Sequence, residues 1–547
     1  MANIYVDPSA AGPGDGSLSH PFSAWTGVVW SPGNTYLQKR GTTYAGVFRP
    51  AASGTPEQRI TIGAYARSDG SDDPSQPRPV ILLPGSPVTP QGGASIAVYG
   101  QERDFITYRN LDIRNPALPE ASDVAIIWLG KGCVFENIRL TSNCAGVYVY
   151  EKSGVVVSGC TLDVVSCAPT FANHGILVAG NVPIDDIQIL GNTVIHRGGG
   201  SPVSYGIRCE TYRRELPLTR LLLRGNRVAP PPGASPSTNR GAIGIYLVNG
   251  RAAQLDRNTV TGMLSGIRLS SGDGNRVSNN NCSNNMNLGI HVTGFATNFL
   301  IEGNTCNRNG GTASPTYWGR GIELSGAAGP GAVSGHTIRR NTCMFNYNYG
   351  GPLDNGSEGV GIGLDDGVLR CALLSNQLAF NEGNGIQLYG GPPGSRTDTG
   401  GHTISGNVLD TNCTCAVMDR RSGGSAPSPF YAHIQLAYIY GSRTSITSNC
   451  STVPPAAAST WTAARPTSSR ATTSTGEPRF PSKSPSSCHA CRNKRRGLPR
   501  CRCAPGMSRC TMPRHRRCPS HAALHGPARR RRGIETWLPI MQRQTTC

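Results

Sequence analysis

Four side chains in the middle of the chain have the types and spacing needed for acid–base chemistry: Arg268, His291, Glu323 and Asp365. An arginine beside a histidine can neutralise a uronate carboxylate while the histidine removes the proton at C5. That is the chemistry of a lyase or an epimerase, and it needs a base with a pKa near neutrality. The two carboxylates can instead form an acid and base pair for glycoside hydrolysis. The alternative without chemistry is a solvated face of mixed charge.

These residues belong to a recurring phrase, Gly-Ile-x-Leu or a close variant of it. Its copies begin at Gly175, Gly206, Gly244, Gly266, Gly289, Gly321, Gly361 and Gly385. A second phrase alternates with the first and is centred on Asn192, Asn226, Asn258, Asn280, Asn304, Asn341, Asn376 and Asn407. We interpret Asn110 and Asn137 as the start of this second series. Apolar residues on both sides of a polar x predict a strand with one buried face.

The repeat length indicates how these strands are arranged. The closest copies of the second phrase, at Asn258, Asn280 and Asn304, are 22 and 24 residues apart. Three short strands and three turns in that length are typical of one coil of a parallel β-helix. An antiparallel β-sandwich also has many short strands, but it does not require one phrase at one place in every repeat. We expect the recurring Asn to adopt a left-handed turn conformation and to stack along the axis in a ladder.

Such a β-helix would place the reactive candidates on one outer face. Ile and Leu would face the interior and x would face outward, so Arg268, His291 and Glu323 should stack on coils about 4.8 Å apart. Asp365 lies one coil beyond Glu323 and two residues along, which gives about 8 Å between their Cα atoms. That estimate falls in the window of about 6.5–9.5 Å that separates the carboxylates of inverting glycosidases.

Further outward and loop side chains are expected to bind a polymer. They are Arg208, Glu210, Tyr246, Tyr317, Trp318, Gln387 and Tyr389. The insertions 197–205, 229–243, 308–320 and 344–360 would form a wall along one side of the same face, and their aromatic residues suit stacking on sugar rings. For these aromatic residues the alternative is simple packing of the loops onto the coils.

Composition agrees with an all-β chain and divides it into segments. The 69 Gly residues in 547, with 15% charged and 6% aromatic residues, disfavour a helix bundle. The net charge of +20 is concentrated in 451–547, which carries 17 Arg and 2 Lys against 2 Glu. The remaining 450 residues are nearly neutral, so we expect no nucleic-acid partner for them. We therefore predict an N-terminal segment with the first coils in 1–100, the β-helix repeats in 101–450, and a disordered basic tail in 451–547.

Three interpretations of the tail stay open. It is a disordered arm for nucleic acid, or a metal site built from Cys488, His489, Cys491, Cys501 and Cys503, or the product of a reading-frame change near residue 450. The third interpretation would leave the last coils uncapped, with an exposed strand edge and poor solubility.

The rest of the sequence bears on compartment. The start, "MANIYVDPSA", has no apolar segment typical of a secretion signal, and no run of about 18 apolar residues predicts a membrane span. The cysteines before residue 451 occupy apolar strand positions, so we interpret them as small buried hydrophobic residues and not as a disulfide framework. An extracellular or virion-associated protein, released by lysis or by unconventional export, fits these features.

The two alternating phrases resemble those of the right-handed parallel β-helix superfamily, the pectate-lyase-like fold. The N-terminal "IYVDPSAAGPGDGSLSHPFSAW" and the later "PGNTYLQKRGTTYAG" and "RITIGAYARSDG" resemble the segments that lead into the first coils of these proteins. The resemblance covers roughly residues 3–450 and implies a right-handed single-stranded solenoid. It is weakly informative about activity, because the superfamily includes lyases, hydrolases, epimerases, tailspikes and proteins without known catalysis.

Family catalytic motifs do not transfer. "GLDDG" at 363–367 resembles the adjacent aspartates of polygalacturonase-like hydrolases, but no Gly-His-Gly or Arg-x-Lys follows it. The Asp-Pro-His-Asp element of alginate epimerases and the Gly-Gly-x-Gly-x-Asp calcium repeats are also absent from the sequence. We expect no cofactor, and calcium has no motif in its favour. The predicted function is polysaccharide binding, with or without lyase, epimerase or hydrolase chemistry. The alternative is a non-catalytic adhesive or phage tail component, with a homotrimer as one expected form.

Overall fold

The computed structural model describes the repeats and the segment before them, all within one compact unit, Met1–Glu477. The described residues are 1–46, 48–82, 103–114, 127–143, 145–165, 174–197, 204–234, 242–310, 319–326, 329, 331–347, 359–390, 399–412, 433–437 and 443–452. Tyr317, Trp318 and the tail beyond residue 452, with its cysteines, lie outside them. Among the described residues no helix is long and apolar enough to span a membrane.

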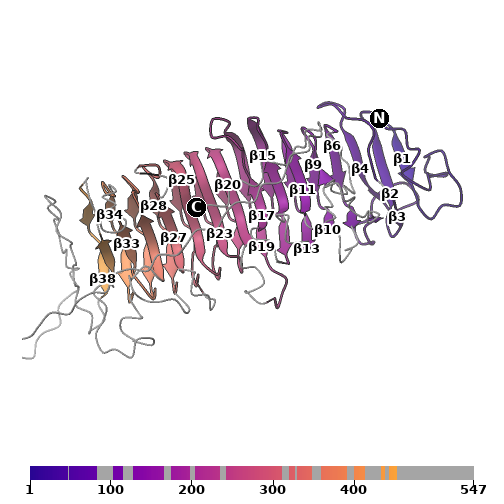
Figure 1. Cartoon of the computed structure of the whole chain (residues 1–547). Coiled ribbons are helices and arrows are strands. Elements are labelled where there is room, and N and C mark those ends of the chain that lie inside the picture. The colour runs from indigo at the N-terminus through magenta and orange to yellow at the C-terminus, as the bar shows by residue number, and fades with distance from the viewer. Residues whose placement is uncertain are drawn as a thin grey trace, which may run out of the picture. The chain divides into compact units, whose positions relative to one another are not determined.

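A complete coil contains three short strands, and strands pair in parallel with their equivalents in the neighbouring coils (Figure 1). One coil runs through β27 (Arg320–Ser325), β28 (Thr337–Arg339) and β29 (Thr342–Met344). The next runs through β30 (Val360–Asp365), β31 (Ala372–Leu374) and β32 (Gln377–Ala379). The pairs β27–β30, β28–β31 and β29–β32 are all parallel. The fold is therefore the right-handed parallel β-helix that the sequence predicts.

The strands line three faces of the β-helix, which we call the first, second and third sheets. The first two are joined where Leu218 pairs with Gly250, and isolated bridges at Asn281 and Thr305 connect the two parts of the third. Besides β27 and β30, the first sheet contains β8 (Ile127–Trp128), β11 (Ala145–Tyr150), β14 (His174–Ala179), β17 (Ser204–Cys209), β20 (Ala242–Arg251), β23 (Ser265–Asp273), β25 (Leu288–Thr297), β33 (Ile386–Tyr389) and β36 (Ile434–Ala437). Besides β28 and β31, the second contains β1 (Asn3–Val6), β2 (Thr35–Lys39), β4 (Ile60–Tyr65), β6 (Ile106–Arg109), β9 (Val134–Glu136), β12 (Val155–Ser158), β15 (Ile184–Leu190), β18 (Leu218–Arg224), β21 (Gln254–Asp256), β24 (Arg276–Ser278), β26 (Leu300–Glu302), β34 (Thr403–Ser405) and β37 (Ser445–Thr447). Besides β29 and β32, the third contains β3 (Thr43–Ala45), β5 (Val80–Leu82), β7 (Asp112–Arg114), β10 (Arg139–Asn143), β13 (Thr161–Val165), β16 (Thr193–His196), β19 (Arg227–Ala229), β22 (Thr259–Val260), β35 (Val408–Asp410) and β38 (Cys450–Thr452).

The apolar residues of the repeated phrase fill the interior. Ile290 and Val292 in β25 are fully buried, as are Ile322 and Leu324 in β27. Burying one such side chain contributes about 1.5–3 kcal/mol relative to leaving it exposed. The same residue types recur in every coil, so one continuous core runs from Val6 to Leu409.

The glycine of the phrase is required by the close approach of neighbouring coils. A Cβ atom on Gly289 would lie 2.5 Å from the carbonyl oxygen of Gly321, and one on Gly321 would lie 2.6 Å from that of Gly361. Backbone oxygens cannot move aside as a flexible side chain can, so a larger residue would displace the strand. This explains why the phrase starts with Gly in coil after coil.

The asparagines of the second phrase form the predicted ladder. Asn280 donates from Nδ2 to the Oδ1 of Asn304 (3.0 Å) and to the carbonyl of Leu255 (2.9 Å). Its backbone N–H donates to the same Oδ1 at 2.9 Å. The pattern starts at Asn192 and continues to Asn449. Each side chain thus satisfies backbone groups at a buried turn, where an unpaired group is costly.

Two expectations about these asparagines are wrong. The left-handed residue is the one that precedes the ladder Asn, for example Asn279 (φ 57°) and Gly303 (φ 65°). Asn110 (φ 61°) and Asn137 (φ 50°) are themselves left-handed, so they occupy this preceding position and do not begin the ladder. The physical reason is that a ladder Asn must point its amide inward along the axis, while the sharp turn is made one residue earlier.

Other side chains cap the remaining turns in the same way. A second ladder, which we did not predict, links Asn285, Asn309, Asn346, Asn381 and Asn412. At another turn His336 and His402 accept hydrogen bonds from the backbone N–H groups of Phe299 (3.0 Å) and Cys371 (3.1 Å) through Nδ1. A ring nitrogen that accepts such a bond must be unprotonated.

The cysteine prediction is confirmed for seven of the eight described cysteines; Cys450, near the end of the described residues, is free but exposed. The thiols of Cys133, Cys160, Cys209, Cys282, Cys306, Cys343 and Cys371 are buried and free. Burial raises the pKa of the Cys133 thiol to about 11 and that of Cys160 to about 12, so both stay protonated. They act as small hydrophobic residues of the core.

Candidate functional site

The first sheet brings three of the four reactive candidates into register on its outer face. Arg268 in β23 pairs with His291 in β25, and His291 pairs with Glu323 in β27. The same line continues through Gly363 and Gln387. The stacking of Arg268, His291 and Glu323 that the phrase predicts is therefore present.

A buried arginine, which the sequence pattern did not indicate, lies between the carboxylates of Glu323 and Asp365. Arg320, the first residue of β27, donates from Nη1 to Oδ2 of Asp365, and the same nitrogen lies 3.7 Å from Oε1 of Glu323. Only 2% of the Arg320 side chain is exposed. Its register partners on the two neighbouring strands are Leu288 and Val360, so an apolar residue is expected at this position.

Gly363 leaves room for this arginine. A Cβ atom at Gly363 would lie 2.8 Å from Nη1 of Arg320. The carboxyl oxygens of Glu323 and Asp365 both lie close to one nitrogen atom. With one oxygen at 3.7 Å from it and the other within a hydrogen bond of at most about 3.2 Å, the two are at most about 7 Å apart. That upper limit is shorter than the separation of about 8 Å expected between the Cα atoms and lies at the lower end of the window of about 6.5–9.5 Å for inverting glycosidases.

The surroundings of Asp365 favour the protonated form of its carboxyl group. Burial is the main cause and, with the neighbouring Glu323 charge, it raises the pKa of Asp365 to about 6, against the opposing effect of Arg320. Its Oδ1 is buried and has no hydrogen-bond partner among the described residues. The adjacent Asp366 also has a raised pKa because of burial and the Asp365 charge. Asp365 can therefore donate a proton under mildly acidic conditions.

His291 is half-buried and uncharged. Burial, followed by the positive charges of Arg268 and Arg320, lowers the pKa of His291 to about 3. In the free protein His291 does not have the pKa near neutrality that we expected, because the imidazole is buried and also faces two guanidinium groups. No hydrogen bond of its ring is found within the described part of the chain. His291 is a neutral imidazole with an available lone pair.

Arg268 is an available cation on the same face. Its guanidinium lies 5.7 Å from the centre of the Tyr246 ring, and its buried Nε has no hydrogen-bond partner. Within the described ranges it forms no ion pair. A buried or half-buried cation without a partner favours an anionic ligand, because an unpaired charge is costly to desolvate.

The predicted binding residues on the preceding coils also come together. Arg208 forms an ion pair with Glu210 at 2.6 Å and lies 4.6 Å over the Tyr205 ring. The rings of Tyr205 and Tyr246 are stacked, with centres 5.4 Å apart. Burial raises the pKa of Glu210 against the effect of Arg208. Toward the other end, Gln387 donates to Oε1 of Gln435 at 2.9 Å, and Tyr389 pairs in register with Asp365.

Further aromatic residues extend this face, and the sequence analysis did not assign them. The ring of Trp128 lies 6.0 Å from Tyr148 and 6.1 Å from Tyr150, and Tyr150 lies 6.5 Å from Tyr212. Nε1 of Trp128 is buried without a hydrogen-bond partner. The signal was present in "GVYVY" at 146–150, where the two tyrosines hold alternate positions of a weak copy of the phrase. Aromatic rings and the reactive cluster thus share one sheet face.

Comparison with known proteins agrees with this architecture. Residues 236–427 match the family model described as "Right handed beta helix region". Over this span the sequence is similar to that family, and the described residues have the right-handed β-helix fold. No curated protein matches it. Similar solved structures include a lacto-N-biosidase from Eubacterium ramulus, with 14% identity, coverage of 74% of this chain and 67% of that one, and a TM-score of 0.44.

Two other solved structures are similar over a comparable span. The mannuronan C-5 epimerase A-module of Azotobacter vinelandii has 17% identity, coverage of 65% of this chain and 90% of that one, and a TM-score of 0.40. Tailspike protein 3 of bacteriophage CBA120 has 11% identity, coverage of 72% and 60%, and a TM-score of 0.36. At these identities the function of this β-helix has to be argued from its own residues.

The side chains of the cluster suit proton transfer to and from a ligand that carries a negative charge. Arg268 supplies a positive charge, His291 a neutral base, and Asp365 a proton. No group of three His, Cys, Asp or Glu side chains that could hold a metal ion occurs among the described residues.

Proposed function

We propose that the protein binds an acidic polysaccharide along the outer face of the first sheet and carries out proton transfer at Arg268, His291, Glu323 and Asp365. The observation that supports it most is the pairing in register of an arginine without an ion-pair partner and a neutral histidine. An arginine can hold a carboxylate by two parallel hydrogen bonds. The neighbouring imidazole then faces the carbon next to that carboxylate.

In the proposed reaction the carboxylate of a uronate residue pairs with Arg268. Its negative charge offsets the field of the guanidinium and raises the pKa of His291, which makes the imidazole a stronger base. The C5–H bond breaks, the proton passes to an imidazole nitrogen, and the electron pair moves toward the carboxylate. Return of a proton on the opposite ring face gives the epimer. Breakage of the C4–O bond, with a proton from Asp365 to the leaving oxygen, gives the eliminated product.

The aromatic residues of the preceding coils support a polymer as the ligand. The partly exposed rings of Trp128, Tyr148 and Tyr246 offer apolar surfaces along the axis, and Arg208 and Glu210 lie among them. A long face on a solenoid suits an extended chain. A substrate of this kind is met outside the cytoplasm, by an exported protein or by one carried on a virion.

A non-catalytic tail or adhesive component is the second candidate. The pairing of Asp365, Arg320 and Glu323 with one another favours it, because an ion-pair cluster of this kind can serve the scaffold alone. In this case the aromatic face binds polysaccharide without turnover. Trimerisation on a sizing column, together with binding but no product, would support this candidate.

A panel of acidic and neutral polysaccharides tests the proposal. We expect product only from polymers that contain uronate: an unsaturated product with ultraviolet absorbance for a lyase, or inverted C5 without chain cleavage for an epimerase. His291→Ala and Asp365→Asn should each lower the rate at least about a hundredfold, the lower end of the contribution of a general acid or base. Arg276→Gln, on β24, is the matched control. New reducing ends without ultraviolet absorbance would indicate hydrolysis at Glu323 and Asp365, and equal rates in all variants would remove the proposed site.

A further inference from the structure

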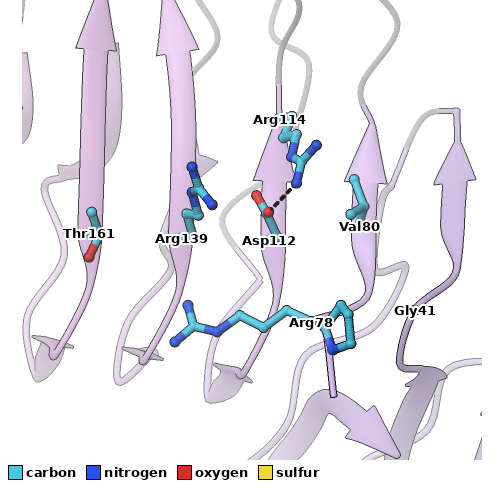
Figure 2. Close-up of a pocket in the computed structure, with 8 residues that line it drawn as sticks. Gly41, Arg78, Val80, Asp112, Arg114, Arg139 and Thr161 are labelled. Atoms are coloured by element: carbon cyan, nitrogen blue, oxygen red, sulfur yellow. Dashed lines mark hydrogen bonds and ion pairs between the residues drawn. The ribbon is translucent and has the colours of Figure 1, made fainter. Parts of the chain in front are cut away.

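A charged cavity lies on the third sheet, near the N-terminal end of the β-helix (Figure 2). Its volume is about 590 Å³, and Arg78, Asp112, Arg114, Arg139 and Thr161 line it. Cavities of about 300–1,000 Å³ hold small ligands. None of these residues belongs to the cluster on the first sheet.

The parallel register builds this cavity from consecutive coils. Val80 in β5 pairs with Asp112 in β7, Asp112 pairs with Arg139 in β10, and Arg139 pairs with Thr161 in β13. Arg114 projects two residues beyond Asp112 on the same strand. Side chains at paired positions lie on one face about 4.8 Å apart. Figure 2 shows Arg78 reaching from the turn before β5 across the lower edge of the same group.

Two polar groups of the cavity lack hydrogen-bond partners among the described residues. Arg114 donates to Oδ2 of Asp112 at 2.6 Å, and Arg78 donates to Oδ1 of Asn137 at 2.5 Å. The side chain of Arg139 has no hydrogen bond or ion pair within the described residues. Asp112 is only 4% exposed, and its Oδ1 is buried with no hydrogen-bond partner in the described part of the chain. One guanidinium and one buried acceptor therefore remain for a ligand.

We propose that this cavity binds an acidic sugar unit of a polysaccharide, at a site separate from the reaction face. The arginines take the carboxylate or sulfate of the sugar, and Oδ1 of Asp112 accepts a hydrogen bond from a ring hydroxyl. Three arginines against one aspartate favour an anion. A buried carboxylate that lacks a donor disfavours a bare phosphate or sulfate and favours a ligand that also carries hydroxyl groups.

The position of the cavity gives the site a role that does not depend on catalysis. The coil that contains β10 lies five coils before the one that contains β23, or about 24 Å at about 4.8 Å per coil. The third sheet also faces a different direction from the first. A chain bound here would be anchored away from the reaction face, so the site would raise affinity for a polymer without contacting the reacting sugar.

Titration calorimetry on the full chain tests this inference. The probes are a uronate tetrasaccharide, a sulfated neutral tetrasaccharide, maltotetraose and inorganic sulfate. Every variant is also made with Arg268→Gln, so that binding at the reaction face is reduced and a failure of the proposed function is seen separately. We expect Arg139→Gln to weaken binding of both acidic tetrasaccharides about tenfold, as loss of one charge-assisted contact does. Arg227→Gln, an exposed arginine of the same sheet in β19, should leave it unchanged.

The Asp112→Asn variant distinguishes a site that binds sugars from a site that binds simple anions. The amide oxygen of Asn is a weaker hydrogen-bond acceptor than the carboxylate of Asp112, and the substitution removes one negative charge. We therefore expect weaker binding of the acidic tetrasaccharides but equal or tighter binding of inorganic sulfate. Tighter binding of both would mean an adventitious ion only and would overturn the inference, as would unchanged affinity in Arg139→Gln. Equal competition by a single-stranded oligonucleotide would assign the cavity to nucleic acid instead. Melting temperatures of the variants confirm that each is folded.

Discussion

At the scale of single residues, the electrostatic surroundings of His291 decide what the cluster can do. Two guanidinium groups and burial keep the imidazole neutral, with a pKa of about 3. We expect Arg268→Gln to raise the pKa of His291 by about one unit, because one of the two positive charges is removed. Histidine ring signals in NMR titrations measure this directly. Arg276→Gln on the second sheet should cause no shift, and an equal shift in both variants would contradict the assigned cause.

Gly363 gives a second residue-scale prediction. Gly363→Ala would place a methyl group 2.8 Å from Nη1 of Arg320 in its present position, so the arginine must move. We expect the Asp365 carboxylate to lose its ion-pair partner and activity to fall at least about tenfold. Gly12→Ala is the matched control, since a Cβ there would meet nothing within 4 Å. A crystal structure of Gly363→Ala with Arg320 unmoved would rule out this explanation.

The sequence predicted part of this cluster for a clear reason. Arg268, His291 and Glu323 hold the x position of a repeated phrase, and parallel register stacks equivalent positions. Arg320 holds a position that is apolar in the coils on either side, so no pattern distinguished it. The pKa of His291 could not be predicted, because it depends first on how deeply the imidazole is buried and then on the two nearby arginines, of which Arg320 lies outside the repeated phrase.

At the scale of elements, the asparagine ladder links one coil to the next. Asn280→Ala would leave the carbonyl of Leu255 and the backbone N–H of Asn258 without partners. We expect a loss of about 2–4 kcal/mol in the free energy of unfolding, the cost of two or more buried unsatisfied groups. Chemical denaturation measures it. Asn281→Ala changes an exposed neighbour, so a similar loss there would contradict the ladder explanation.

Strand positions and the ladder could be predicted because both recur with the coil. The left-handed residue before the ladder could not, since Gly, Asn, Arg and Ser all occupy it in different coils. The sequence pattern did not indicate the role of His336 and His402 either, because at their turn histidine accepts the backbone hydrogen bond that asparagine accepts at other turns.

At the scale of the whole β-helix, buried neutral histidines should control stability in acid. Burial lowers the pKa of His336 and of His402 from 6.5 to about 4, and lowers that of His174 further. Between about 4 and 6.5 the unfolded chain binds protons that the folded chain does not, so stability falls as the pH is lowered. Each of the two shifts corresponds to about 3 kcal/mol at most. Asp365, whose folded pKa is about 6, acts in the opposite direction and offsets part of the effect.

The double variant His336→Asn, His402→Asn tests this explanation. Asn275 already accepts a backbone hydrogen bond of this kind from Ala253, so Asn can replace the histidines as a cap. We expect the difference in denaturation midpoint between pH 7.5 and pH 5 to shrink in the variant. An unchanged difference would show that other groups cause the acid sensitivity.

The most direct test of the central claim is the pKa of His291 with and without a uronate oligosaccharide. NMR titration of the free protein should give a value of about 3. A carboxylate bound to Arg268 should raise that value clearly toward the ordinary 6.5, and Arg268→Gln should abolish the response. An oligosaccharide that binds the protein while the pKa of His291 stays unchanged would contradict the proposal that the acidic sugar occupies this site.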